Sequence, residues 1–144
     1  KARHEAYFAG LAMRPGSRGW ITDVCVPISR LAECIMATKE DVAGSPLLGA
    51  ILGHVGDGNF HVGYMVDPAQ PAELAMAKQL NDRMVARAIA MGGTCTGEHG
   101  IGVGKRESLI KEHGDAVEVM RQIKDALDPL GLMNPAKIFL ERAT

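Results

Sequence analysis

No stretch of this 144-residue sequence approaches the roughly 20 consecutive apolar residues that a membrane-spanning helix requires. Blocks of like charge are also missing, because 16 basic and 17 acidic residues are interspersed and leave a formal net charge of −1. Such a chain lacks the basic patch on which nucleic-acid binding depends. We therefore expect no transmembrane segment and no nucleic-acid partner.

Cysteine is scarce, and the arrangement of Cys25, Cys34 and Cys95 excludes two of its common uses. An odd number of cysteines without C-x-x-C spacing argues against both a disulfide framework and a cysteine-based zinc site. We expect reduced thiols and a cytoplasmic location. An initiating methionine and an apolar signal-peptide region are also missing near Lys1, so we expect a piece of a longer protein.

What the sequence does contain is the composition of an ordinary globular domain, with 47% hydrophobic and 23% charged residues. One domain over residues 1–144 is therefore the default prediction. Strand patterns cover residues 20–27, 47–54 and 59–66, and helical patterns cover residues 30–40, 71–91 and 115–127. A short strand at residues 94–97, a glycine-rich loop at residues 98–104 and an irregular tail from Asn134 complete the assignment. This order predicts an α+β fold, a ferredoxin-like antiparallel sheet with helices packed on one face.

The strands at residues 47–54 and 59–66 flank Gly56-Asp57-Gly58, which predicts a hairpin with Asp57-Gly58 as its two-residue turn. In that register His54 lies directly opposite His61, on the same face of the sheet. Opposed Cβ atoms are about 5 Å apart, a separation from which two imidazoles can bind one metal ion. The alternative is a pair of strand histidines satisfied by backbone groups or water, and the shared register favours metal binding over it.

Two imidazoles need a third protein ligand, and Glu98, in the glycine-rich segment after the long helix, is the best candidate. Two imidazoles and a carboxylate without a thiolate suit a divalent ion such as zinc, manganese or iron, and the residues do not select among these. His99, next to Glu98, is the candidate base for a substrate hydroxyl that the metal has made more acidic. Capping of local backbone groups is the alternative role for Glu98 and His99.

Three segments stand out together: His54-Val-Gly-Asp-Gly-Asn-Phe-His61, Gly92-Gly-Thr-Cys-Thr-Gly-Glu-His-Gly-Ile-Gly102 and Asp128-Pro-Leu-Gly-Leu-Met-Asn-Pro-Ala-Lys137. They resemble the C-terminal domain of the FAD-linked oxidases related to vanillyl-alcohol oxidase, particularly the group of D-lactate dehydrogenase, D-2-hydroxyglutarate dehydrogenase and glycolate oxidase. The segment Thr22-Asp-Val-Cys-Val-Pro-Ile-Ser-Arg30 also resembles the start of this part of the lactate-type enzymes. The resemblance spans essentially the whole chain.

The resemblance implies a dehydrogenase in which FAD takes a hydride from a D-2-hydroxy acid, while a divalent metal, zinc or manganese by preference, holds the hydroxyl and carboxylate. It assigns the metal ligands as His54, His61 and Glu98. It assigns His99 as the base. Arg3 would bind the substrate carboxylate through a bidentate pair, with a solvated arginine as its alternative role. Asn134 would approach the flavin.

Departures from the family pattern leave the substrate open. Ala136 stands where the family's tail usually has glycine, and Gly63 stands where some relatives carry a polar substrate contact. Nothing in the sequence resembles the N-terminal flavin-binding domain, so FAD is expected to be bound mainly by that domain of the same parent chain. This piece by itself is expected to be inactive, and its electron acceptor is not identified.

Two functions of other classes remain open. One is a stand-alone module that binds a metal or a small carboxylate without redox activity, because the ligand set is self-contained. The other is a metal-dependent hydrolase, for which the sequence has no nucleophile-positioning motif.

Overall fold

The computed structural model describes the backbone of residues 2–141 and the side chains of residues 5–141. The chain forms two compact units, Lys1–His99 and Gly100–Thr144, each with its own helices. No helix among the described residues is long and apolar enough to cross a bilayer. The division into two units leaves the one-domain assignment as a prediction.

The first unit is α+β, as the sequence predicts. Its elements are α1 (Ala2–Met13), β1 (Arg18–Cys25), α2 (Ile28–Ala43), β2 (Leu48–His54), the 3-10 turn η1 (Val55–Asp57), β3 (Asn59–Val66) and α3 (Pro71–Ala90). The three strands form an antiparallel sheet in the order β1-β3-β2. Residues 94–97, predicted as a short strand, make only an isolated antiparallel bridge from Thr94 to Cys25 at the end of β1. This bridge stands where a ferredoxin-like sheet has its fourth strand.

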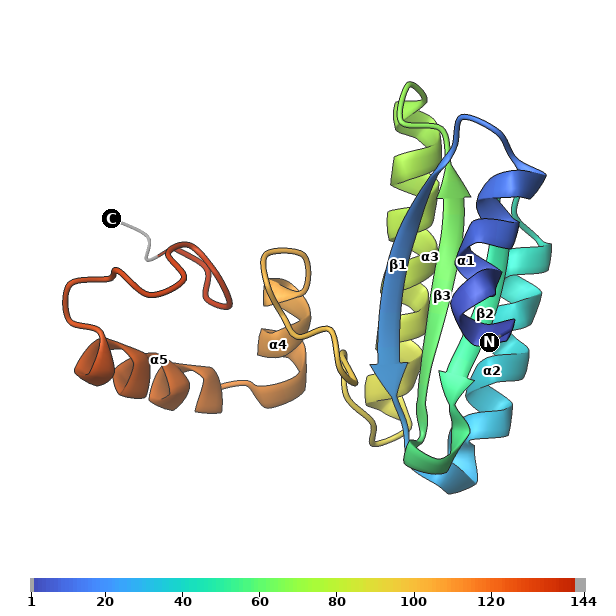
Figure 1. Cartoon of the computed structure of the whole chain (residues 1–144). Helices are drawn as coiled ribbons and strands as arrows, with labels where there is room; N and C mark the ends of the chain where they lie inside the picture. Colours follow the sequence, from blue (N-terminus) through green and yellow to red (C-terminus); the bar gives the residue numbers. More distant parts are fainter. Residues whose placement is uncertain (1, 142–144) are drawn as a thin grey trace. The chain divides into compact units, whose positions relative to one another are not determined.

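The hydrophobic core lies between the sheet and helices α2 and α3, which cover the face of the sheet that is turned away from the viewer in Figure 1. Alternate residues of β3, Phe60, Val62 and Tyr64, point into this core and are at most 1% exposed. On α3, Leu80 and Met84 meet them at helical spacing and are equally buried. Strand and helix periodicities in the sequence therefore identify the same core.

Helix α1, for which the sequence pattern gave no expectation, lies over the other face of the sheet (Figure 1). Its Gly10 lies against the side chain of Met65, and its Tyr7 lies against Gly19 of β1. Both contacts are near the end of the sheet where β1 begins and β3 finishes. The other end of this face carries the polar residues of the candidate site.

The hairpin between β2 and β3 differs from its prediction in register. His54 pairs with Asn59, and Leu52 is the residue opposite His61. Four residues, Val55 to Gly58, connect the strands as a 3-10 turn followed by Gly58 in the left-handed region at φ 76°. The physical reason is tertiary: the Gly58 carbonyl accepts a hydrogen bond from Val26 N–H at 3.0 Å, which holds the turn against the chain that leaves β1.

The register error does not move His54 to the other face of the sheet. Side chains alternate along a strand with a period of two, so a shift of one residue would invert every side chain, whereas a shift of two inverts none. The observed pairing differs from the predicted one by two residues. His54 and His61 consequently share a face, as diagonal rather than directly opposed neighbours.

The second unit contains α4 (Arg106–His113) and α5 (Ala116–Leu127). Helix α5 agrees with its prediction, whereas α4 was not predicted because its polar sequence carries little helical periodicity. The tail after α5 is irregular, as expected, and is held by Asp128, whose carboxylate accepts the N–H groups of Leu132 and Met133 at 2.9 and 2.8 Å. Residues 102–105, in and just after the glycine-rich segment, form a turn ahead of α4.

Candidate metal and catalytic site

Three predicted ligands converge on the face of the sheet opposite α2 and α3. His54 ends β2, His61 lies on β3, and Glu98 lies in the loop after α3. The Glu98 Oε1 atom is 2.8 Å from His61 Nε2 and 3.6 Å from His54 Nε2. One ligand atom from each residue lies within 4.8 Å of the other two, so the three side chains surround a common point.

This donor set fits a divalent cation. The two imidazole rings are 5.8 Å apart and nearly perpendicular, at 78°, so that each can present a nitrogen to a shared ion. The exposed side-chain fraction rises from 12% at His61 to 28% at His54 and 47% at Glu98. A bound ion would therefore remain accessible to a substrate oxygen, as a catalytic rather than a purely structural site requires.

The environment of His61 favours the form that binds metals. Burial lowers the pKa of His61 below its ordinary value of 6.5, and the attraction of the Glu98 carboxylate opposes this effect only in part. The neutral imidazole is the metal-binding form of histidine. The Nδ1 atom of His61 is buried and has no hydrogen-bond partner among the described residues.

His99, the predicted base, stands beside the three ligands. Its ring stacks on that of His61 with centroids 4.9 Å apart and planes 26° apart. Its side chain is 42% exposed, so the ring can contact a molecule that reaches the ligands. The structure thus brings together all four residues that the sequence proposed for the chemistry.

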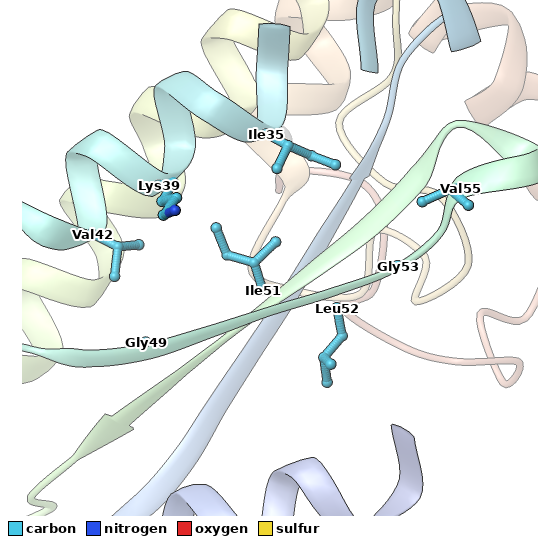
Figure 2. A pocket seen from close by; sticks show the side chains of 8 residues that line it. All are labelled: Ile35, Lys39, Val42, Gly49, Ile51, Leu52, Gly53 and Val55. Atoms are coloured by element: carbon cyan, nitrogen blue, oxygen red, sulfur yellow. The ribbon is translucent and has the colours of Figure 1, made fainter. Parts of the chain in front are cut away.

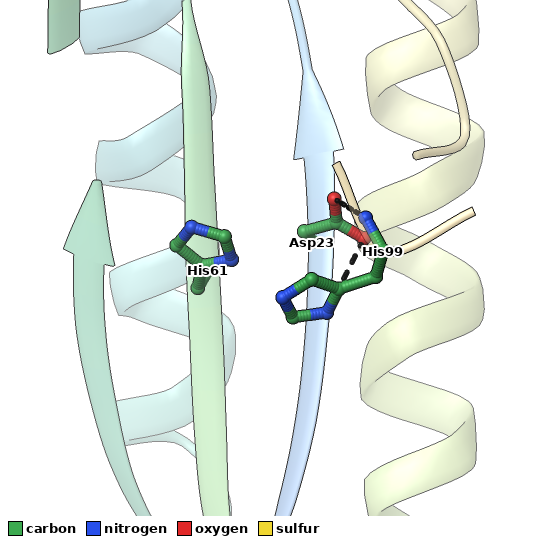
Figure 3. Close-up of side chains that lie close together, drawn as sticks. All are labelled: Asp23, His61 and His99. Carbon is green, nitrogen blue, oxygen red and sulfur yellow. Dashed lines mark hydrogen bonds and ion pairs between the residues drawn. The ribbon is translucent and has the colours of Figure 1, made fainter. Parts of the chain in front are cut away.

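One residue of the site, Asp23, was missed by sequence reasoning. It lies on β1 directly opposite His61, and Figure 3 shows its carboxylate turned to His99. With His61 and His99 it forms a second group whose potential ligand atoms lie within 4.8 Å of one another. An aspartate inside an apolar, alternating strand was the signal that could have found it, because charged residues are rarely buried without a specific partner.

Comparison with known proteins identifies the family. Residues 1–138 match the family described as FAD linked oxidases, C-terminal domain. The chain belongs to this family.

Several curated members of the family are similar to the chain. It is 52% identical over 139 residues to "Probable D-lactate dehydrogenase, mitochondrial" of Danio rerio, a match that covers 96% of the chain and 28% of that protein. It is 49% identical to "D-lactate dehydrogenase [cytochrome], mitochondrial" of Arabidopsis thaliana over 96% of the chain and 24% of that protein. It is 32% identical to "Glycolate oxidase subunit GlcD" of Bacillus subtilis over 99% of the chain and 30% of that protein. The chain thus spans about a quarter of the length of these relatives.

The two remaining site predictions are not placed at the ligands by this structure. Arg3 belongs to α1, and its side chain lies outside the described residues. Asn134 belongs to the second unit, where its backbone takes a left-handed conformation at φ 49° in the tail. Both assignments remain predictions from the family resemblance.

An apolar hollow lies in the first unit, and neither His54 nor His61 lines it. It has a volume of about 440 Å³ and lies between α2 and the edge strand β2. Figure 2 shows Ile51 pointing toward α2 while Leu52 points to the opposite side of β2. Leu52 is paired with His61 and shares its face, and because it also lines the hollow, the hollow reaches around the edge of the sheet at β2.

Proposed function

We propose that this chain is the substrate- and metal-binding part of a flavin-dependent dehydrogenase that oxidises a D-2-hydroxy acid, D-lactate or a close analogue, to the 2-oxo acid. The observation that carries the proposal is the convergence of His54, His61 and Glu98, with His99 stacked beside them, in a member of the FAD-linked oxidase family. The names of the relatives from Danio rerio and Arabidopsis thaliana point to D-lactate rather than another acid.

In the proposed reaction, the substrate loses two hydrogens in different forms. The chemistry that bound FAD would supply is acceptance of the C2 hydrogen as a hydride, and the hydroxyl hydrogen would leave as a proton, so that the C–O single bond would become a carbonyl. His54, His61 and Glu98 would hold a divalent ion, zinc or manganese by preference, whose positive charge makes a nearby hydroxyl more acidic. A flavin-binding domain of the same parent chain would supply FAD.

The role of His99 in this scheme is to take the hydroxyl proton. Its Nδ1 atom faces the Asp23 carboxylate at 3.8 Å, which leaves Nε2 as the atom that accepts the proton from substrate. Arg3 would bind the substrate carboxylate, and Asn134 would approach the flavin. These two roles rest on the family resemblance alone.

A chimera tests the proposal directly. This chain replaces the matched segment of the Danio rerio relative, which supplies the other three quarters of the protein. We expect the purified chimera, loaded with FAD and Zn²⁺ or Mn²⁺, to reduce its flavin with D-lactate and not with L-lactate. His99→Ala in the chimera should slow flavin reduction by about 100- to 10,000-fold, the usual contribution of a general base.

The chimera also has an outcome that would reject the proposal. If the intact relative is reduced by D-lactate while the folded, FAD-loaded chimera is reduced by no D-2-hydroxy acid, this chain is not a substrate-binding part of such an enzyme. Equal rates for the chimera and its His99→Ala variant would reject the role of His99 alone.

A second function is favoured by one feature. All three ligands lie within the first unit, so the chain could bind a metal or a small carboxylate without a flavin domain. Calorimetric titration of the isolated chain with D-lactate, with and without Zn²⁺, separates the two proposals, because a stand-alone module should bind the acid at micromolar concentration.

The cellular location is also open to experiment. We retain the cytoplasmic location as a proposal, since the word mitochondrial in two relatives' names describes those proteins. Fractionation of cells that express the natural protein would test it.

A further inference from the structure

The carboxylate of Asp23 is a negative charge with no exposure to solvent. Asp23 is 0% exposed near the end of β1, on the face of the sheet that carries His61. Taking a carboxylate out of water costs several kcal/mol unless hydrogen bonds or opposite charges compensate it. The hydrogen bonds that Asp23 accepts therefore indicate what its burial achieves.

Four hydrogen-bond donors come from the loop that carries Glu98 and His99. Asp23 Oδ2 accepts three consecutive backbone N–H groups, from Gly97 at 2.7 Å, Glu98 at 2.7 Å and His99 at 3.2 Å. The Thr96 hydroxyl donates to the same carboxylate, 3.1 Å from Oδ1. Successive backbone amides that converge on one anion form a nest, and hydrogen bonds to a charged acceptor are about twice as strong as neutral ones.

The loop needs such an anchor because it has little other regular structure. Residues 95–100 lie outside every helix and strand, and the isolated bridge between Thr94 and Cys25 ends before Glu98. A ligand and a base on an unanchored loop would lose their positions relative to His54 and His61, which are held by the sheet. The amides of Glu98 and His99 are instead tied to β1 at the residue opposite His61.

We propose that Asp23 is the positioning residue of this site: its buried carboxylate fixes the backbone of Glu98 and His99, and thereby sets the third metal ligand and the base against His54 and His61. This inference rests on the proposed function. In this proposal, the His99 Nδ1 atom, which faces Asp23, serves to orient the base (Figure 3).

Asp23 acts in this way rather than as a metal ligand, although it is near enough to His61 and His99 to be one. Its Oδ2 atom already accepts three N–H groups, and its Oδ1 atom accepts the Thr96 hydroxyl. A metal at Asp23 would have to displace these donors in a place with no solvent access. Glu98, in contrast, is 47% exposed and turns its carboxylate to the two histidines.

The chain offers a closely matched control for the test. Thr22, the preceding residue of β1, is also buried, but its hydroxyl donates to Asn81 Oδ1 at 2.7 Å on the opposite, helix-covered face. Loss of either polar side chain leaves buried hydrogen-bonding groups without partners and lowers stability. Only loss of the Asp23 carboxylate should affect the site.

The experiment measures two properties of the wild-type chain, Asp23→Asn and Thr22→Val. In the first measurement, Zn²⁺ affinity is determined by competition with a chromogenic chelator on the folded fraction. We expect Asp23→Asn to weaken it by about 10- to 100-fold, as loss of a residue that orients metal ligands usually does, and Thr22→Val to leave it unchanged. In the second measurement, without metal, the amide protons of residues 97–99 should exchange much faster in Asp23→Asn only.

Each outcome decides a separate point. Wild-type affinity and wild-type amide protection in Asp23→Asn would overturn the positioning role, as would equal losses in Thr22→Val. If the wild-type chain binds no Zn²⁺ or Mn²⁺, the metal part of the proposed function fails, and the exchange measurement still decides whether Asp23 anchors the loop. If Asp23→Asn does not fold, Thr96→Val removes one donor to the carboxylate, and the absence of any change in affinity and protection would then overturn the role.

Discussion

At the scale of single residues, the site combines side chains whose surroundings differ sharply. Asp23 is fully buried and His61 is largely buried, whereas Glu98 and His99 are almost half exposed. Buried residues hold the geometry, and the exposed ones can meet a substrate. This gradient is what a catalytic metal site needs, because one coordination position must remain open to the substrate.

Removal of any single ligand should abolish stoichiometric metal binding. In His54→Ala, His61→Ala and Glu98→Ala the two remaining protein ligands are too few for a stable site. Elemental analysis after loading with Zn²⁺ and gel filtration should find about one ion per wild-type chain and almost none per variant chain. His113→Ala, which changes a histidine of α4, is the control and should retain the ion. Retention of the ion in any of the three variants would remove that residue from the ligand set.

At the scale of elements, the loop after α3 closes on the hairpin through a contact that only glycine permits. A Cβ atom at Gly97 would lie 2.3 Å from Asn59 Oδ1, far inside van der Waals contact. Asn59 is buried at the start of β3, where it pairs with His54. The close contact at Gly97 therefore packs the segment that carries Glu98 against the hairpin that carries His54 and His61.

Gly97→Ala should push the loop away from the hairpin. We expect a loss of about 1 to 3 kcal/mol in the free energy of unfolding, the usual cost of overpacking, together with weaker Zn²⁺ binding. Gly104→Ala is the control, because a Cβ atom at that position meets nothing within 4 Å. Urea denaturation and the chelator competition measure the two effects. Equal behaviour of the two variants would show that the close approach at Gly97 is not needed.

Helices and strands with strong local sequence patterns were the elements predicted most accurately. The β3 boundaries, Asn59 and Val66, were predicted correctly, as was helix α3 to within one residue, because both have strong periodicity. The hairpin turn was predicted with the wrong length, since its conformation depends on a hydrogen bond to Val26 that no local signal reveals. The face shared by His54 and His61 survived this error because the shift was even.

At the scale of the whole molecule, the core of the first unit contains a tyrosine that couples stability to pH. Tyr64 is 1% exposed between the sheet and the helices. Burial raises the pKa of Tyr64 from 10 to about 12, because the phenolate would be poorly solvated there. Below pH 10 the phenol is neutral in both the folded and the unfolded chain. Between the two pKa values the unfolded chain loses the proton first, so stability falls as pH rises.

The free energy of unfolding should therefore decrease by roughly 2 to 3 kcal/mol as the pH rises from 10 to 12. Tyr64→Phe should remove this part of the pH dependence, and Tyr7→Phe, which changes the only other tyrosine, should retain it. Chemical denaturation at several alkaline pH values measures the effect. The same decline in Tyr64→Phe as in the wild-type chain would assign it to other groups.

The sequence by itself determined the α+β class, the two core periodicities, the shared face of His54 and His61, and the family, because these follow from local alternation and from motifs of fixed spacing. Only the tertiary structure decided the hairpin register, the place of α1 on the second face, the approach of Glu98 to both histidines, and the role of Asp23. These features depend on contacts between residues far apart in the chain. Asp23 and Glu98 are 75 residues apart, and no local pattern records that the carboxylate of one accepts the amide of the other.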